Sequence, residues 1–310
     1  MIADTLNNTI DKSRQKAVLH TLQYYSLFHY PLTAEEILSN MAVATQLNLL
    51  KETLDHLQMT GIVFDHDGYY SLEENVEDLV YKRKQANSLA ARKISRAIGV
   101  GKFIYLFPFV RFIGISGSLS KGYADNKSDF DFFIVTETNR LWICRTLLHL
   151  FKKLTFLAGQ QHKFCMNYFV DLQKLEIEEK NCYTAIELAS LIPVSGAEVY
   201  DQLQRDNDWI KKFLPNEYIG FSKKNDSAAN SKNMLKRSLE SCIDLLGPAK
   251  LNATFMKMTD TKWRKKWARK NYPMQDYDLA FKTTLHISKN HSANHQKRVL
   301  TALSKLNSEQ

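Results

Sequence analysis

The sequence predicts an α+β fold in which a short mixed sheet lies in the middle of the chain, between helical segments. Three observations support this prediction. Helix-start and helix-stop signals alternate through residues 1–75 and end in a hairpin pattern. Short runs of β-forming residues follow between residues 109 and 171. Residues 221–310 show helical periodicity and an excess of Lys and Arg.

Length and composition are those of a globular protein with two or three domains. The chain has 310 residues, 44% of them hydrophobic and 24% charged. The first twenty residues lack an apolar core after a basic start, which argues against a signal peptide. Four His, Lys and Arg residues interrupt the most apolar stretch, Leu141 to Ala158, which argues against a membrane span. We therefore expect a cytoplasmic protein that does not bind membranes.

The first expected domain, residues 1–75, reads as three helices and a hairpin. The first helix is expected over Ser13–Phe28. A Thr-x-x-Glu capping box at residues 33–36 opens the second, and Thr45–Met59 forms the third. A turn at residues 65–68 separates two short β-runs. Three helices followed by two strands resemble a winged-helix domain.

The charge of this winged-helix-like module argues against DNA binding. It contains four Lys and Arg against ten Asp and Glu, a net charge of −6. Phosphate contacts dominate nucleic-acid affinity and require Lys and Arg. We therefore expect a protein-contact or intramolecular role for this module.

The second expected domain, residues 76–220, begins with a long linker helix that ends near Gly99. Phe109–Ser116 then reads as a buried strand, because it is short and rich in β-forming residues. The strand ends at Gly117, and Ser118 opens a short helix whose free backbone N–H groups suit a phosphate.

Two carboxylates begin the next expected strand, Asp129–Val135. Asp129 and Asp131 are separated by one residue, and side chains two apart on a strand share a face. Like charges held this close repel each other, so such a pair usually needs a compensating cation. Carboxylate oxygens suit Mg²⁺, with Mn²⁺ as the alternative. The sequence therefore predicts a metal site beside Gly117.

The Gly-Ser pair at 117–118, the gap of ten residues and the Asp-Phe-Asp-Phe run resemble the signature of the DNA polymerase β-like nucleotidyltransferase superfamily. The resemblance covers about residues 105–175 and departs at Ser116, where an apolar residue is usual. It implies that Asp129 and Asp131 are catalytic and hold metal ions. It also implies that the Gly-Ser pair binds the β- and γ-phosphates of an NTP.

Three cations are expected near this triphosphate: Lys121, Arg140 and Arg145. One of them would neutralise charge that develops on the phosphates. The alternative is that they form ordinary surface ion pairs. We assign Lys121 to nucleotide binding together with Gly117 and Ser118.

The superfamily commonly has a third carboxylate on a following strand, which here is expected over Lys163–Asp171. Asn167 lies mid-strand, where the third acid is expected, but an amide cannot accept a proton. Asp171 is a carboxylate four residues further on, on the same face of the strand. We predict Asp171 as the catalytic base. If neither residue serves, the reaction would be slow, substrate-assisted or lost.

Downstream, helices are expected over Tyr183–Ile192, stopped by Pro193, and over Asp208–Leu214. The polar stretch 222–233 reads as a linker. Four widely spaced cysteines without a CxxC pair argue against a zinc site or a disulfide framework.

The third expected domain, residues 221–310, is a basic helical region. It carries 18 Lys and Arg against seven Asp and Glu, a net charge of +11, which makes it the candidate surface for RNA. Trp263 and Trp267 lie one helical turn apart among cations. They predict either a stacking platform for a single strand or two core-facing rings beside a solvated basic face.

We therefore expect a metal-dependent nucleotidyltransferase that moves an NMP from an NTP to an unidentified acceptor. One alternative is a non-catalytic nucleotide-binding or regulatory protein, which the amide at Asn167 favours. The other is an RNA-directed nucleotidyltransferase that uses the basic C-terminal region.

Overall fold

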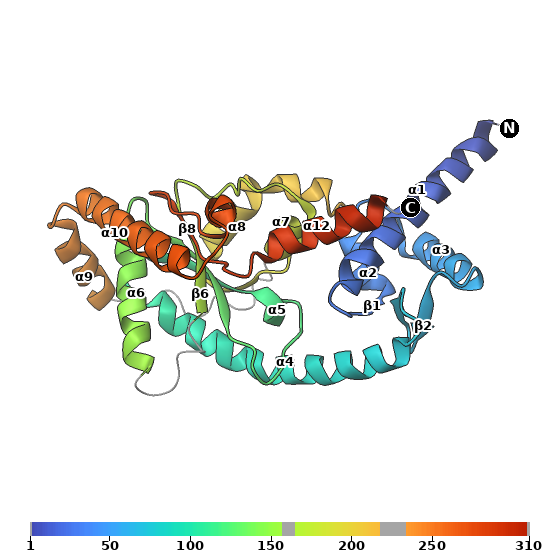
Figure 1. The fold of residues 1–310 in the computed structure, drawn as a ribbon, viewed down its shortest axis with the longest axis horizontal. Coiled ribbons are helices and arrows are strands. Elements are labelled where there is room, and N and C mark those ends of the chain that lie inside the picture. Colours follow the sequence, from blue (N-terminus) through green and yellow to red (C-terminus); the bar gives the residue numbers. More distant parts are fainter. Residues whose placement is uncertain (1, 157–164, 218–233, 309–310) are drawn as a thin grey trace.

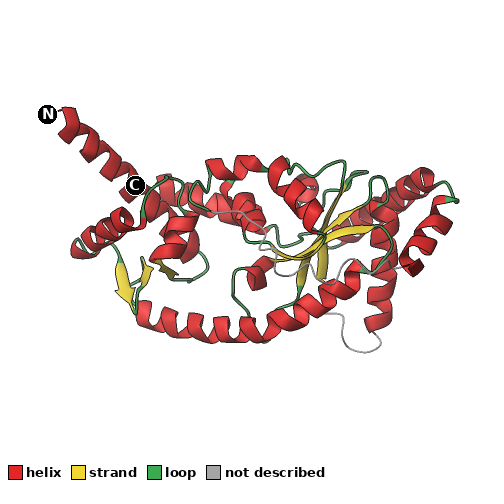
Figure 2. Cartoon of the chain, turned by 180° about the vertical axis from the view of Figure 1, so that it is seen from behind, coloured by secondary structure: helices red, strands yellow, loops and turns green. Residues whose placement is uncertain are grey.

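The computed structural model describes residues 2–156, 165–217 and 234–308. The chain is α+β, as predicted from the sequence, with an N-terminal module at one end and a core built on a five-stranded sheet at the other (Figure 1). Helix α4 (Val76–Tyr105) runs along one side of the molecule and joins the two parts (Figures 1 and 2). It continues well beyond the predicted end near Gly99.

The N-terminal module contains three helices and a three-stranded antiparallel sheet of order β1-β3-β2. Its elements are α1 (Ile2–Ser26), β1 (Leu32–Thr33), α2 (Ala34–Asn40), α3 (Leu47–Met59), β2 (Phe64–His66) and β3 (Tyr69–Ser71). The predicted capping box is confirmed, because Thr33 and Glu36 each accept a hydrogen bond from the backbone N–H of the other. The hairpin turn is tighter than predicted and consists of Asp67 and Gly68, which both have positive φ.

The core sheet has the order β7-β4-β5-β6-β8. Its strands are β4 (Val110–Ser116), β5 (Asp131–Thr136), β6 (Cys165–Asp171), β7 (Ile192–Ser195) and β8 (Ile287–Lys289). Strands β5 and β6 are parallel and are connected through α6 (Leu141–Phe156), while the other neighbouring pairs are antiparallel. The predicted short mixed sheet is therefore confirmed.

Side chains that alternate along the strands place one hydrophobic cluster on each face of the sheet. Ile113 and Phe132 belong to a cluster that α4 and α6 cover. Phe112 and Phe133 point the other way, into a cluster that also includes Leu54 of the N-terminal module. One continuous core therefore connects the module to the sheet.

Helices α7 (Cys182–Ala189) and α8 (Ala197–Asp206) and the 3₁₀ helix η2 (Asp208–Lys212) contribute to this second cluster. The helix predicted to run to Ile192 ends at Ala189 instead. Pro193 lies in β7, which pairs only with β4 at that edge of the sheet. An edge strand tolerates proline because its N–H is not needed for pairing.

The C-terminal region completes the core. It comprises α9 (Met234–Asp244), α10 (Pro248–Arg269), η4 (Met274–Asp276), α11 (Tyr277–Ala280), β8 and α12 (His295–Ser308). Strand β8 pairs with β6, α10 packs on α6, and α12 contacts α1 and α7. Ile287 and Val299 belong to the same hydrophobic cluster as Leu54, whereas Trp263 and Phe281 belong to a small cluster formed within the C-terminal region. The predicted linker at 222–233 lies outside the described residues.

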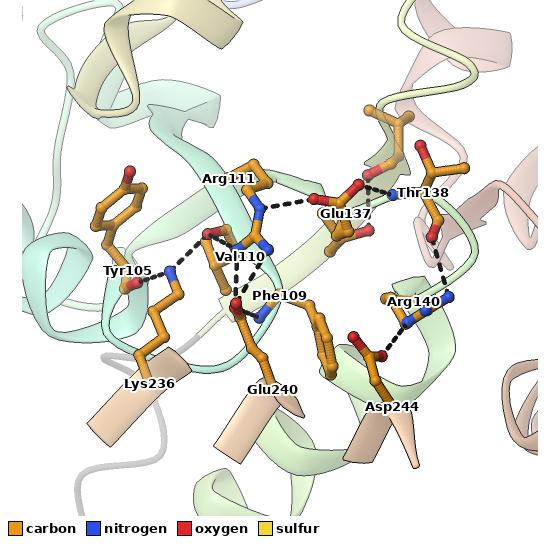
Figure 3. Close-up of polar contacts among 12 residues, drawn as sticks. Tyr105, Phe109, Val110, Arg111, Glu137, Thr138, Arg140, Lys236, Glu240 and Asp244 are labelled. Carbon is orange, nitrogen blue, oxygen red and sulfur yellow. Dashed lines mark hydrogen bonds and ion pairs between the residues drawn. The ribbon is translucent and has the colours of Figure 1, made fainter. Parts of the chain in front are cut away.

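Polar contacts attach α9 to the edge of the core (Figure 3). Glu240 accepts hydrogen bonds from the backbone N–H of Phe109 and from the guanidinium of Arg111, at 2.5 and 2.8 Å. Lys236 donates to two backbone carbonyls, those of Tyr105 and Val110. Among the residues that the structure describes, no helix is long and apolar enough to span a bilayer.

Candidate functional site

The Gly-Ser corner lies directly against Asp131. Strand β4 ends at Ser116, which pairs with Asp131 across the sheet, and the chain then turns at Gly117 into the four-residue helix α5 (Gly117–Ser120). Gly117 has φ of +69°, and a Cβ atom added to it would lie 2.6 Å from Oδ2 of Asp131. Only glycine allows this backbone conformation together with so close an approach. The next residue, Ser118, is exposed.

The two predicted metal ligands are in different backbone contexts. Asp131 is the first residue of β5, whereas Asp129 lies in the loop two residues before it. The prediction that both acids lie on one strand is therefore wrong, although they remain close enough to interact. Burial raises the pKa of Asp131 to about 6, and the nearby negative charges of Asp129 and Glu187 act in the same direction.

Glu187 is a site residue that the sequence reasoning missed. It lies on α7, and its Oε1 is 2.8 Å from Nζ of Lys121. Lys121 also donates to the backbone carbonyl of Gly117 at 3.1 Å. The predicted nucleotide-binding cation is thus beside the corner but is already paired. Glu187 is the single charge in the apolar run from Tyr183 to Ile192, and that isolation was the available signal.

Asn167, and not Asp171, is the β6 residue next to the acids. Nδ2 of Asn167 donates to Oδ1 of Asp131 at 3.3 Å and lies 3.0 Å from Sγ of Cys165. Asp171 pairs with Thr136 at the opposite end of the parallel strands. Five residues of strand separate the two ends, roughly 16 Å. The prediction of Asp171 as the catalytic base is therefore corrected, since it lies too far from Asp131.

Asp171 instead holds together the other end of the sheet. Its carboxylate is fully buried and accepts hydrogen bonds from the backbone N–H groups of Asn139 and Gln173, at 2.9 and 3.0 Å. Nδ1 of His286 lies 2.8 Å from the same carboxylate. These contacts connect the turn after β5, the turn after β6 and the approach to β8.

Arg140 and Arg145 are not near the Gly-Ser corner. Arg140 directly precedes α6 and Arg145 lies in it, and this helix follows the end of β5 that is remote from Asp131. Arg140 pairs with Asp244 of α9, so the ion-pair alternative is confirmed for it. The guanidinium of Arg145 is buried over the rings of Trp142 and Trp263, and this burial lowers its pKa to about 9.

The loop between α5 and Asp129 is held by the N-terminal module and α4. The hydroxyl of Tyr30 donates to the carbonyl of Lys121 at 3.3 Å, and Nδ2 of Asn87 donates to the carbonyl of Gly122 at 2.5 Å. Lys93 donates to the carbonyl of Asp125 at 2.6 Å. We call residues 121–128 the return loop. Its conformation depends on contacts with elements far away in sequence.

The two carboxylates suit a hard divalent cation. The carboxylate oxygens of Asp131 are ligands of the kind that such a cation prefers. The raised pKa of Asp131 is expected for a buried charge that lacks a full counter-charge. Within residues 2–156, 165–217 and 234–308, no three His, Cys, Asp or Glu side chains gather into a metal site of their own. A magnesium ion held by Asp129 and Asp131 would therefore need further oxygens, which substrate phosphates supply in many enzymes.

The tryptophans of the basic helix α10 face the protein. Trp263 is 9% exposed, and Trp267 stacks on Phe281 with a centroid distance of 4.8 Å. The core-facing interpretation is therefore confirmed for Trp263, and the stacking platform is not formed. Exposed cations in the last two turns of the same helix include Lys262, Lys265, Lys266 and Arg269, and Lys270 follows directly after it.

The histidines of this region are dispersed. His286 contacts Asp171, whereas His291 is packed beside Tyr168 with a ring-centroid distance of 6.0 Å. Burial lowers the pKa of His291 to about 4.

No family model, curated protein or solved structure matches this chain. What the protein does is therefore inferred from its own residues and their geometry. The residues gathered at the candidate site are Gly117, Ser118, Lys121, Asp129, Asp131, Asn167 and Glu187.

Proposed function

We propose that the protein is a metal-dependent nucleotidyltransferase that transfers an NMP from an NTP to an acceptor. The observation that carries the proposal is the close approach of Gly117 to Asp131. A Cβ atom added to Gly117 would lie 2.6 Å from the carboxylate of Asp131. The first turn of α5, whose N–H groups have no partner within the helix, and a pair of carboxylates thus lie at one end of neighbouring strands. Phosphate binding and metal binding are the two functions that these groups suit.

Each residue has a defined task in this proposal. The backbone at Gly117 and the hydroxyl of Ser118 bind the phosphates, and Asp129 and Asp131 hold Mg²⁺. The bound metal neutralises charge on the phosphates and orients them for in-line displacement. Lys121 keeps the carbonyl of Gly117 in place and offsets the charge of Glu187.

The charges of two carboxylates, Asp129 and Glu187, raise the pKa of Asp131, and Glu187 is the one that is not a proposed metal ligand. It is therefore a better candidate than Asp171 for accepting a proton from the acceptor hydroxyl. To do so it would first have to separate from Lys121, 2.8 Å away. Because Glu187 starts in an ion pair, we expect turnover of the NTP to be slow when the acceptor is absent.

Calorimetric titration with each NTP, with and without Mg²⁺, tests the proposal. We expect metal-dependent binding that is lost when Asp129→Asn and Asp131→Asn are combined, together with loss of pyrophosphate release. A matched control replaces two exposed acids of α8, Asp201→Asn with Asp206→Asn, and should bind as the unchanged protein does. Binding that ignores both the metal and the Asp129/Asp131 double substitution would refute the proposal.

A non-catalytic nucleotide-binding or regulatory role is the second candidate function. The amide of Asn167 beside Asp131 favours it, because an amide can ligate a metal only weakly and cannot accept a proton. The same titration separates the two candidates. A regulatory protein would bind NTP with Mg²⁺ but release no pyrophosphate with any acceptor, including RNA.

A further inference from the structure

A cavity of about 360 Å³ lies where the N-terminal module, α4 and the return loop meet. Its walls include Phe28, His29 and Tyr30 from the module, Lys82 and Arg83 from α4, and Tyr123 from the return loop. Gly117, Ser118, Asp129 and Asp131 do not line it, so it is distinct from the Gly-Ser corner. Its volume lies in the range of pockets that hold small molecules.

Aromatic rings are exposed inside this cavity. Phe28 is 47% exposed and Tyr123 39%, although both rings line a concave surface. Tyr30 packs against Tyr123 in an edge-to-face arrangement, with centroids 6.1 Å apart. Exposed aromatic surface in a hollow is costly in water, and a planar ligand that stacks on Phe28 or Tyr123 would remove that cost.

Two cations of α4 and one acid, Glu73, line the cavity. Arg83 is buried over the ring of Tyr30, and its charge is already matched by Glu36 at 2.5 Å. Lys82 is exposed on the same helix and has no acidic partner among the described residues. Because Glu73 contacts Nδ1 of His29 and Arg83 pairs with Glu36, Lys82 is the side chain of the lining that an anionic group would contact.

The backbone at the rim is in an uncommon conformation. His29 has φ of +50°, which residues with a side chain rarely adopt, and its Nδ1 lies 3.0 Å from Glu73. Such conformations are retained where the surrounding structure requires them, often at ligand sites. Phe28 and Tyr30, the neighbours of His29 in the chain, both line the cavity.

We propose that this cavity binds a nucleoside monophosphate, with the base stacked on Phe28 and Tyr123 and the phosphate on Lys82. The proposal goes beyond the nucleotidyltransferase function, because it concerns a separate site that needs no metal. Tyr30 and Tyr123 connect it to the return loop, through the hydrogen bond from Tyr30 to Lys121. A ligand there changes the affinity of the Gly-Ser corner for NTP, and NTP changes the affinity of the cavity by the same factor.

Calorimetry with AMP in the presence of EDTA tests the proposal, because the metal-dependent site is then silent. We expect one saturable site, and weaker binding of adenosine and of inorganic phosphate than of AMP. Phe28→Leu and Lys82→Gln should each weaken AMP binding at least about fivefold, in line with the loss of one stacking or phosphate contact. Phe28→Leu keeps an apolar side chain and so preserves the fold, which circular dichroism checks.

The matched controls are Tyr81→Ala and Lys102→Gln, two exposed residues of α4 that do not line the cavity. They should bind AMP as the unchanged protein does. The proposal is overturned if millimolar AMP gives no saturable binding, or if Phe28→Leu and Lys82→Gln leave the affinity unchanged. It is also overturned if the Asp129→Asn and Asp131→Asn double substitution abolishes AMP binding, since AMP would then occupy the Gly-Ser corner. The NTP titration with Mg²⁺ reports separately on that corner.

Discussion

Asp131 is a single residue whose charge opposes folding. Its carboxyl has a pKa near 3.8 in an unfolded chain and about 6 in the folded protein, chiefly because burial penalises the charged form. The folded state therefore binds more protons between pH 4 and pH 6, and stability falls as the pH rises through that interval. Above pH 6 the full cost is present. A bound metal would offset it, which is consistent with a ligand role for this side chain.

Asp131→Asn should therefore stabilise the metal-free protein at pH 7.5, by about 1 to 3 kcal/mol, and give little gain at about pH 3, where the carboxyl is largely protonated in both states. Urea unfolding at the two pH values measures this. The exposed Asp201→Asn on α8 is the control and should change stability little at either pH. A loss of stability in Asp131→Asn at pH 7.5 would mean that favourable contacts of the carboxylate outweigh the cost of its burial.

Asp171 has the opposite character, because its buried carboxylate is fully hydrogen-bonded. Asp171→Ala leaves the N–H groups of Asn139 and Gln173 without their acceptor. We expect the free energy of unfolding to fall by about 2 to 4 kcal/mol, while NTP affinity is retained. Asp171→Asn keeps one acceptor oxygen and should cost less. Reduced NTP affinity in a folded Asp171 variant would contradict the separation between this residue and the Gly-Ser corner.

Among the elements, α9 is held to the core mainly by polar contacts (Figure 3). Its apolar residues Leu235 and Leu239 are 71% and 44% exposed, whereas Glu240 accepts hydrogen bonds from Phe109 and Arg111. Hydrophobic burial therefore contributes little to the position of this helix. Attachment through a few largely buried polar groups makes α9 sensitive to single substitutions.

Glu240→Ala should release α9, because it removes the partner of Arg111 and the acceptor for the N–H of Phe109. We expect a loss of about 2 to 4 kcal/mol and faster amide hydrogen exchange within Met234–Asp244. Arg237→Ala, an exposed substitution on the same helix, is the matched control. Unchanged exchange in Glu240→Ala would show that other contacts position α9.

At the scale of the whole molecule, the acidic and basic regions are largely separated. The N-terminal module and α10 lie at opposite ends of the chain's long axis (Figure 1). Of the basic region, α12 contacts α1, while α10 packs against α6. The acidic module therefore does not cover the exposed cations of α10. These cations remain available to a polyanion, but the inward-facing Trp263 cannot stack on bases.

If RNA is a partner, it should bind through phosphate contacts, with steep salt dependence and little sequence preference. Replacing Lys262, Lys265 and Arg269 by Gln should reduce the slope of log affinity against log salt by about 2, since each lost phosphate contact contributes about 0.7 on single strands. Fluorescence anisotropy with single-stranded RNA over a salt series measures the slope. Arg264→Gln is the control, because Asp260 and Asp278 already pair with Arg264. Binding that salt does not weaken would exclude this surface.

The candidate site shows which features local sequence could predict. The turn at Gly117 and the two acids followed from residue types a few positions apart. The choice between Asn167 and Asp171 did not follow from local sequence. It depends on the register of β6 against β5, which shifts between Phe132 and Phe133 and leaves Asn167 beside Asp131. Counting along one strand could not reveal which end of it meets the acids.

The amino-acid sequence by itself determined the local structure: the capping box at Thr33, the alternation of Phe112 and Ile113 between the two faces of the sheet, and the turn at Gly117. These features depend on backbone conformation and on neighbours within a few positions, so residue type is enough to predict them. Only the tertiary structure decided that Glu187 joins the site and that Asp171 does not. Strand order, register and helix docking depend on packing between residues far apart in the chain, and no local pattern encodes which of them meet.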